Sequence, residues 1–154
     1  AMDAFEALSG IAGESHELMG TNVLYEPETQ SPLPSTAHGR LRRVVGGRML
    51  RFDYRWAYRS EAHEGTLLLA RDTDGRVTAA WGDSWHQNRE LMSLSGESND
   101  GAVALRGTWT VGDSPPWGWR IDLGPSEDGG VTMEMWVVTP DGEEARAVEM
   151  VLSR

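Results

Sequence analysis

Beyond its first dozen residues, the chain consists of short runs in which apolar and polar side chains alternate. The clearest run spans residues 48–59, whose apolar positions are Leu50, Phe52, Tyr54, Trp56 and Tyr58. The positions between them are mostly charged. Successive side chains of a β-strand point to opposite faces of the sheet, so this pattern predicts a strand with one buried face.

The same alternation assigns an inward face to each later run. Residues 77–85 would point Val77, Ala79, Trp81, Asp83 and Trp85 inward. The other inward sets are Val103, Leu105, Gly107, Trp109 and Val111, then Trp117, Trp119, Ile121 and Leu123, then Met133, Met135 and Val137, and finally Val148, Met150 and Leu152. Nearly every run keeps one polar side, as in antiparallel sheets.

Clusters of turn-forming residues separate these runs. They lie at 27–35, 46–47, 60–61, 72–75, 87–88, 98–101, 112–116, 124–130 and 140–142, and leave room for about ten strands. Strands joined by tight turns are antiparallel neighbours, and closing the sheet on itself removes its two exposed edges. We therefore predict an all-β fold, a closed antiparallel up-and-down barrel of about ten strands with spare interior volume. A β-sandwich is the alternative, and only 27–35 is long enough for the crossing it needs.

Asp3 and Glu6 indicate a short helix before the first strand, since this spacing forms a capping box. We expect the helix to run through about Leu8 and to end at Ser9 and Gly10. Residues 1–12 then form a helix and lead-in to a single domain spanning residues 1–154.

Composition favours one globular domain. A chain of 154 residues, 39% hydrophobic and 25% charged, can bury one core. No apolar run approaches the roughly 20 residues of a membrane helix. The first ten residues lack the basic and apolar regions of a signal peptide, so we expect a cytoplasmic protein without membrane contacts.

Charge narrows the expected partners and chemistry. The net charge of −10 would repel nucleic-acid phosphates and anionic lipids. The chain has no Lys and no Cys, which excludes Schiff-base chemistry, a Walker-type phosphate loop, thiolate nucleophiles and iron–sulfur clusters. Arg51, Arg55 and Arg59 would form an outer stripe, with Glu61 or Glu64 as acidic partners.

Several motifs resemble one bacterial family. They are Trp-Gly-Asp-Ser-Trp-His at 81–86, Met92 with Gly96, Leu-Arg-Gly-Thr-Trp at 105–109, Trp-Gly-Trp-Arg-Ile at 117–121, and Pro-Asp-Gly at 140–142 with Glu149 and Arg154. From about Gly13 to the C-terminus the chain resembles domain-of-unknown-function family fifteen seventy-nine, whose fold is similar to lipocalins and fatty-acid-binding proteins. The resemblance implies a closed barrel with a cavity and no established activity. Leu18 stands where such proteins often carry a Trp near the first strand.

Asp83 stands out because alternation places its carboxylate inside the barrel, beside Trp81 and Trp85. A buried carboxylate needs hydrogen-bond donors or a raised pKa. It could orient a ligand or act as a general base, or it could simply accept hydrogen bonds from Trp, Tyr or backbone donors. We predict that it is shielded from water and hydrogen-bonded.

Ser84 and His86 come close to a nucleophile elbow, but no Gly follows at the fifth position and no helical pattern continues the chain. On an extended strand their side chains would lie roughly 7 Å apart, too far for proton transfer. We therefore assign no catalytic residue. Asp83 and His86 would fall on opposite faces, and the scattered histidines form no metal motif. A nitrobindin-like haem site, with His86 as the axial ligand, stays open.

The leading hypothesis is a barrel that binds a small apolar or amphipathic molecule without a cofactor. Its ligand-binding residues would be Tyr54, Trp56, Tyr58, Trp81, Asp83, Trp85, Trp119 and Met135. The alternatives are an enzyme that uses Asp83 or His86 as general acid or base, the haem protein, and a barrel filled by its own side chains. In that last case an exposed edge or rim would pair two copies as a homodimer.

Overall fold

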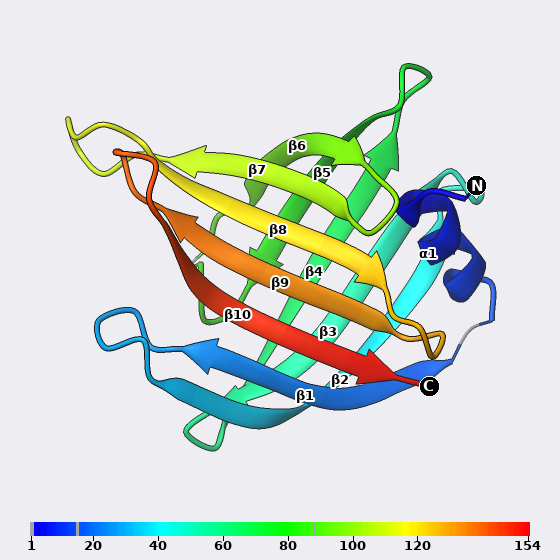
Figure 1. Cartoon of the computed structure of the whole chain (residues 1–154), viewed down its shortest axis with the longest axis horizontal. Helices are drawn as coiled ribbons and strands as arrows, with labels where there is room; N and C mark the ends of the chain where they lie inside the picture. The colour runs from blue at the N-terminus through cyan, green and yellow to red at the C-terminus, as the bar shows by residue number, and fades with distance from the viewer. Residues whose placement is uncertain (1, 15, 88) are drawn as a thin grey trace.

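A computed structural model describes residues 2–14, 16–87 and 89–154, and its strands form one closed antiparallel barrel (Figure 1). The elements are α1 (Ala4–Ala12), β1 (Glu17–Tyr25), β2 (Pro32–Val44), β3 (Met49–Tyr58), β4 (Glu61–Arg71), β5 (Arg76–Asp83), β6 (Met92–Ser98), β7 (Val103–Trp109), β8 (Trp117–Pro125), β9 (Val131–Val138) and β10 (Glu144–Ser153). Each strand pairs with the next in sequence, and β1 pairs with β10 to close the barrel. The predicted all-β barrel with a short N-terminal helix is confirmed.

The alternation along the strands correctly predicts the buried face. On β3, Leu50, Phe52, Tyr54 and Trp56 are buried, while the residues between them are exposed or partly exposed. Most inward positions of β8, β9 and β10 are likewise buried, among them Ile121, Met133 and Leu152, whereas Trp117 and Val137, near the open end, are only partly buried. Val111 is a correction: β7 ends at Trp109, so alternation no longer applies, and the Val111 side chain is 58% exposed.

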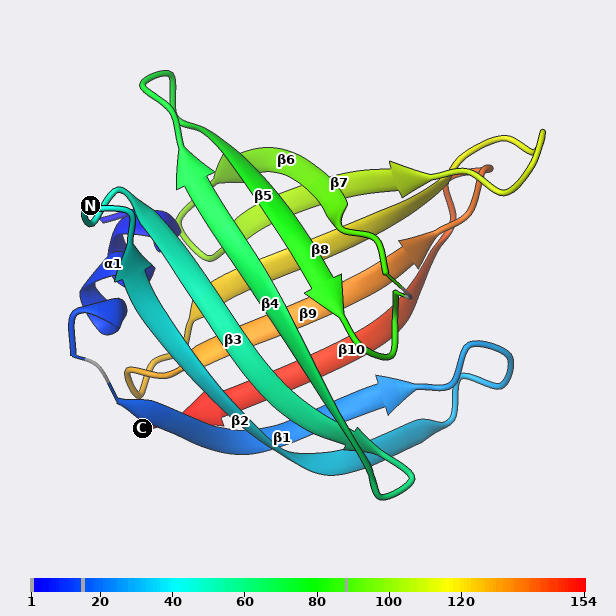
Figure 2. The same cartoon turned by 180° about the vertical axis from the view of Figure 1, so that it is seen from behind.

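α1 covers one end of the barrel (Figures 1 and 2). Asp3 caps it by accepting a hydrogen bond from the backbone N–H of Glu6 at 3.0 Å, as predicted. The helix continues past Ser9 and Gly10 to Ala12, because Ala4, Leu8 and Ala12 form one buried stripe. Apolar burial on that stripe outweighs the weak helix propensity of Gly.

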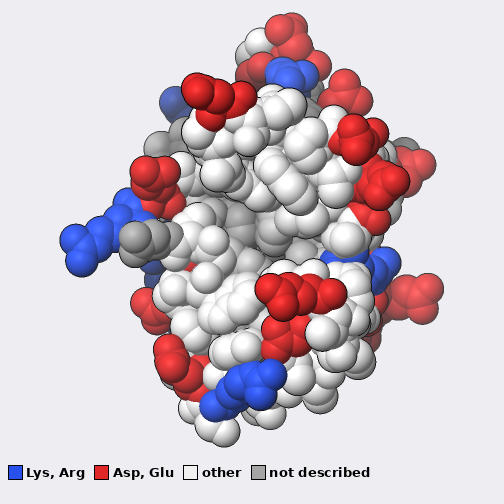
Figure 3. Space-filling model, turned by 90° about the vertical axis from the view of Figure 1, so that its left-hand side faces the viewer, with Lys and Arg blue, Asp and Glu red and all other residues white. Residues whose placement is uncertain are grey.

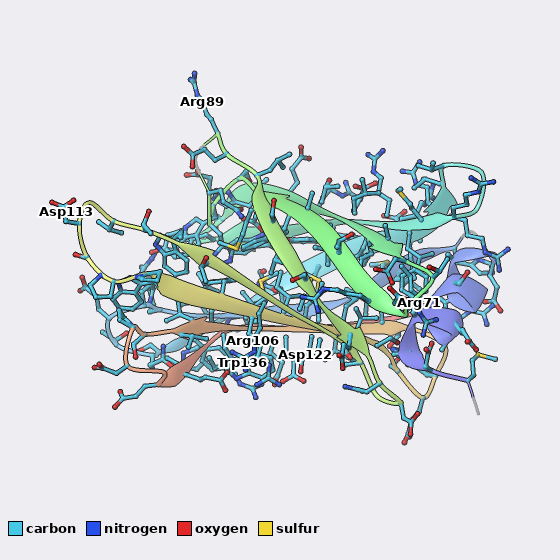
Figure 4. The ribbon with its side chains drawn as sticks, turned by 90° about the horizontal axis from the view of Figure 1, so that it is seen from above. Arg71, Arg89, Arg106, Asp113, Asp122 and Trp136 are labelled. Atoms are coloured by element: carbon cyan, nitrogen blue, oxygen red, sulfur yellow. The ribbon has the colours of Figure 1, made fainter. Side chains whose placement is uncertain are left out.

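Polar contacts fasten α1 to the strands below it. Asp3 pairs with Arg71 at the end of β4, and Figure 4 shows Arg71 beside the helix. Arg43 of β2 donates from Nε to the carbonyl oxygen of Ser9 at 2.9 Å. This end of the barrel is therefore closed.

Two predicted turns are too long. β2 begins at Pro32 rather than after 35, and β8 continues to Pro125. Pro32 and Pro34 pair with β1, whereas the pairing of β2 with β3 begins only at His38. On the side away from β1, this part of β2 has no partner strand, so proline, which lacks an N–H, can stand there without breaking a hydrogen bond between strands. Within the turn predicted at 87–88, Asn88 lies outside the described residues.

The arginine stripe lies on the outer face, but its acidic partners differ from those expected. Arg51 pairs with Asp53 at 3.0 Å, Arg55 with Glu17 at 2.9 Å and Arg59 with Glu26 at 3.0 Å. Glu17 and Glu26 belong to β1 and the turn after it, two strands away from β3. Long arginine side chains reach across the sheet to them, which alternation along a single strand does not reveal.

The other end of the barrel is open and is formed by the connections β1–β2, β3–β4, β5–β6, β7–β8 and β9–β10 (Figure 2). Of the helices in the described ranges, none is long and apolar enough to span a membrane.

Backbone strain in the β2–β3 turn gives a testable prediction about stability. Val45 has φ +53° and is 59% exposed, so its branched side chain adopts a left-handed conformation without gaining burial. Val45→Asn should raise the free energy of unfolding by about 1 kcal/mol, because Asn tolerates this conformation. The measurement is urea unfolding. The matched control, Val111→Asn, changes an exposed Val without positive φ and should stay within about 0.5 kcal/mol of wild type. Equal changes in the free energy of unfolding for the two substitutions would show that the backbone at Val45 is not strained.

Candidate functional site

A row of three residues across neighbouring strands organises the open half of the barrel. Tyr54 of β3 lies opposite Gly65 of β4, which lies opposite Asp83 of β5. A Cβ atom on Gly65 would come within 2.2 Å of Cζ of Tyr54. The Tyr54 ring therefore crosses directly over Gly65 and brings its hydroxyl to Asp83.

The Asp83 carboxylate accepts four hydrogen bonds. Oδ2 accepts from the Tyr54 hydroxyl at 2.7 Å and from Nε1 of Trp56 at 3.2 Å. Oδ1 accepts from the backbone N–H groups of Trp85 at 2.8 Å and His86 at 3.1 Å. Asp83 is only 5% exposed, which confirms the prediction of a buried, partnered carboxylate. A carboxylate has about four lone-pair sites, so these donors saturate it.

Tyr54 links Asp83 to Trp81. Nε1 of Trp81 donates to the Tyr54 hydroxyl oxygen at 2.9 Å, while that hydroxyl donates to Asp83. Burial, together with the negative charge of Asp83, holds the pKa of Tyr54 well above its ordinary value. The phenol therefore keeps its proton and serves as a donor.

His86 lies inside the barrel mouth, which corrects the expectation that it faces away from Asp83. β5 ends at Asp83, and the backbone then turns, with the N–H of Gln87 donating to the carbonyl oxygen of Asp83 at 3.0 Å. The strand alternation that separated the two side chains stops there. Residues 84–87 fold back instead and carry the imidazole inward.

Four tryptophans surround the His86 ring. The ring centroids lie 4.8 Å from Trp85, 5.2 Å from Trp119, 5.6 Å from Trp81 and 5.9 Å from Trp56. Burial lowers the pKa of His86 to about 4, so the imidazole is neutral at pH 7. The indoles packed around the imidazole favour an aromatic cluster over the haem alternative.

Ser84 pairs with His63 rather than with His86. Its Oγ lies 2.9 Å from Nδ1 of His63 and accepts from the backbone N–H of Glu64 at 3.0 Å. His63 is on β4, 21 positions away in the chain, so inspection of the motif around Ser84 could not find it. Both bonds fasten the solvent-exposed Ser84 to β4 and fix the start of the β5–β6 connection.

A hollow of about 760 Å³ opens between this connection and β7, β8 and β9. Its lining is Trp81, His86, Gln87, Arg89, Glu90, Leu91, Met92, Ser93, Thr108, Trp109, Thr110, Trp119 and Val137. We call it the mouth pocket. Figure 3 faces the open end and shows a shaded hollow amid uncharged surface. Its volume lies within the roughly 300–1,000 Å³ of small-molecule sites.

The structure distributes the eight proposed ligand-binding residues over several places. Trp81 and Trp119 line the mouth pocket. Tyr58 and Trp85 line a separate hollow of about 540 Å³ against the β1–β2 connection. Tyr54, Trp56 and Asp83 form the hydrogen-bonded group, and Met135 is packed in the core.

Gln87 and His86 are pocket residues that the sequence did not place there. No periodic signal could have shown their position, because both follow the end of β5. Trp109 carried a signal, since alternation assigned it inward. The described part of the chain contains no group of three or more acidic or His residues arranged to hold a metal ion.

Asp83→Asn tests the hydrogen-bonded group. In the variant, an amide NH2 replaces one carboxylate oxygen and cannot accept the hydrogen bonds that this oxygen accepted. The free energy of unfolding should therefore fall by about 1–3 kcal/mol at pH 7. Urea unfolding measures it. Asp122→Asn is the control, because Asp122 pairs with Arg120 at 2.8 Å on the outer face (Figure 4) and should cost less than about 1 kcal/mol. A neutral or stabilising Asp83→Asn would show that the four donors do not depend on a charged acceptor.

The pH dependence of stability tests the burial of His86. The pKa of His86 falls from 6.5 in the unfolded chain to about 4 in the folded one. Between these two pH values the unfolded chain therefore carries a proton on His86 that the folded chain does not. Stability is therefore lost as pH falls through this window, by about 1 kcal/mol at pH 5.5 and about 3 kcal/mol by pH 4. His86→Phe should remove this loss in urea unfolding, whereas replacing the exposed His16 by Gln should leave it. Parallel curves for wild type and His86→Phe would refute the burial.

Comparison with known proteins places the chain in one family. No curated protein matches it. A family model described as "Protein of unknown function (DUF1579)" matches residues 6–154, which includes most of α1 as well as the whole barrel. The match begins a few residues before Gly13, where the motif resemblance was expected to start. This chain therefore belongs to the DUF1579 family of proteins of unknown function.

Proposed function

We propose that this barrel binds a small apolar or amphipathic molecule in the mouth pocket. The observation that carries the proposal is the pocket itself, a hollow of about 760 Å³ lined by Trp81, Trp109, Trp119, Met92 and Val137. Aromatic and thioether side chains form adaptable apolar surfaces that suit such ligands.

The ligand would lie near the open end rather than deep inside. At the closed end the barrel is filled by its own side chains, among them Phe52, Leu69 and Leu123, which are fully buried. This filling is what the self-filled alternative predicts for the whole interior. The mouth pocket, which side chains of the barrel leave unfilled, favours ligand binding over the self-filled barrel.

The catalytic alternative has less support from the geometry. Asp83 would have to give up one of its four hydrogen bonds to act as a base. His86 is neutral and surrounded by indoles, and acid–base catalysis usually needs two convergent titratable groups.

Binding of the uncharged fluorescent dye prodan tests the proposal. The dye should bind and quench tryptophan emission, because Trp81, Trp109 and Trp119 line the pocket. Trp119→Ala should raise the Kd about tenfold or more, since it removes a large apolar contact surface.

Trp136→Ala is the matched control. Trp136 lies on the outer face, with its ring 4.2 Å from the Arg120 guanidinium and 5.2 Å from that of Arg146 (Figure 4). Its loss should leave the Kd within about twofold. Urea unfolding of both variants verifies that they are folded. A dye that neither binds nor quenches, or equal Kd values for the two variants, would overturn the proposal.

A further inference from the structure

Two polar atoms of the mouth-pocket residues have no hydrogen-bond partner within the described ranges. They are Nε1 of Trp119, a donor, and Oε1 of Gln87, an acceptor. Trp119 is 7% exposed, so its N–H is shielded from solvent as well as from protein acceptors. Buried polar groups are normally paired, and leaving one unpaired costs about 1–3 kcal/mol.

The two atoms differ in what they require from a ligand. The Trp119 N–H needs a lone pair, and the Gln87 oxygen needs an N–H or O–H. A head group with both an acceptor and a donor can satisfy the two together. Because both atoms are shielded, a ligand reaches them only if side chains lining the pocket move, and the β5–β6 connection supplies several of these, among them Gln87 itself and the exposed Leu91.

Charge around the pocket disfavours an anionic head group. Arg59 is neutralised by Glu26 at 3.0 Å, and Arg89 points away from the barrel (Figure 4). Acidic groups surround the opening in Figure 3, and the described loops and strand ends there contribute Glu28, Glu61, Glu90, Asp113, Asp141 and Glu143. A carboxylate or phosphate would cross this acidic rim, and the one cationic side chain among the described lining residues, Arg89, points away from the barrel rather than into the pocket (Figure 4).

A cationic head group meets a different obstacle. The acidic rim would attract it, and the indoles could hold it through cation–π contacts. An ammonium group has no lone pair, however, so it would leave the Trp119 N–H unpaired. His86 is neutral and the Asp83 oxygens are saturated, so the nearest carboxylate free to balance an ammonium charge is that of Glu90, which is exposed at the rim.

We propose that the mouth pocket selects uncharged amphipathic molecules whose head group both accepts and donates a hydrogen bond, as an amide or a hydroxyl group does. This inference rests on the proposed function, because it names the class of ligand for the same pocket. Trp119 Nε1 would donate to the head-group oxygen, and Gln87 Oε1 would accept from its N–H or O–H.

Displacement of prodan by four ten-carbon compounds tests the selection. Decanamide, decanol, decanoate and decylammonium share one tail and differ in head group, so tail burial cancels in the comparison. At pH 7.5 the amide and the alcohol should bind about tenfold more tightly than either ion, as one lost hydrogen bond to a buried group implies. Methyl decanoate, which accepts but cannot donate, should fall between the two classes.

Two variants assign the preference to the two atoms. Trp119→Phe removes the N–H and keeps an aromatic ring, so the ratio of decanamide to decylammonium affinity should fall towards one, because only the amide accepts from this N–H. Gln87→Ala changes the β5–β6 connection rather than a strand, and the one side-chain hydrogen bond it removes, from Nε2 to the carbonyl oxygen of Trp81, is long at 3.4 Å. It should remove the advantage of decanamide over methyl decanoate, and so gives a result even if Trp119→Phe is unstable. Trp136→Phe on the outer face is the control and should leave every ratio unchanged.

The outcomes separate this inference from the proposed function. Tightest binding of decanoate or decylammonium, or equal binding of all four compounds, would overturn the head-group selection while leaving the pocket as a ligand site. Failure of prodan and of all four compounds to bind would overturn the proposed function, and this inference with it.

Discussion

The open half of this barrel depends on the burial of one carboxylate. Removing the charge of Asp83 from water is costly, so the surrounding chain must supply donors to both oxygens. Tyr54 and Trp56 supply two from β3, and the backbone of residues 85 and 86 supplies two more. The absence of a side chain at Gly65 lets Tyr54 reach across β4. One carboxylate thus joins β3, across β4, to β5 and to the connection that follows β5.

The shape of the mouth pocket is a consequence of this arrangement. Because Asp83 holds the backbone of residues 85 and 86, the connection after β5 folds into the barrel mouth and carries His86 among the indoles. Trp85 packs edge-on against Trp56 of β3, and the imidazole lies between Trp56 and Trp119 of β8. The space beside the imidazole, against β7, β8 and β9, forms the pocket. The carboxylate therefore shapes the pocket without lining it.

The charge distribution complements that shape. The chain carries a net charge of −10, and acidic side chains gather around the open end (Figure 3). The charged lining residues of the pocket, Arg89 and Glu90, are exposed, whereas its inner wall carries neutral His86, the indoles and Met92. An acidic rim around an uncharged interior disfavours anions at entry and gives little compensation to any ion inside. Uncharged molecules are neither repelled by the acidic rim nor left with an unbalanced charge inside the pocket.

The sequence alone determined the barrel and the inward face of its strands. A period of two residues specifies which side chains of a strand share a face, so Tyr54, Trp81, Asp83 and Trp119 could be placed inside before any coordinates were known. Only the tertiary structure decided what lies beyond the strand ends and between distant strands. His86 turns inward, Gln87 reaches the pocket and Ser84 pairs with His63 because of hydrogen bonds between segments far apart in the chain. Local periodicity carries no information about such contacts, since it ends where the strand ends and cannot specify how two strands are registered against each other.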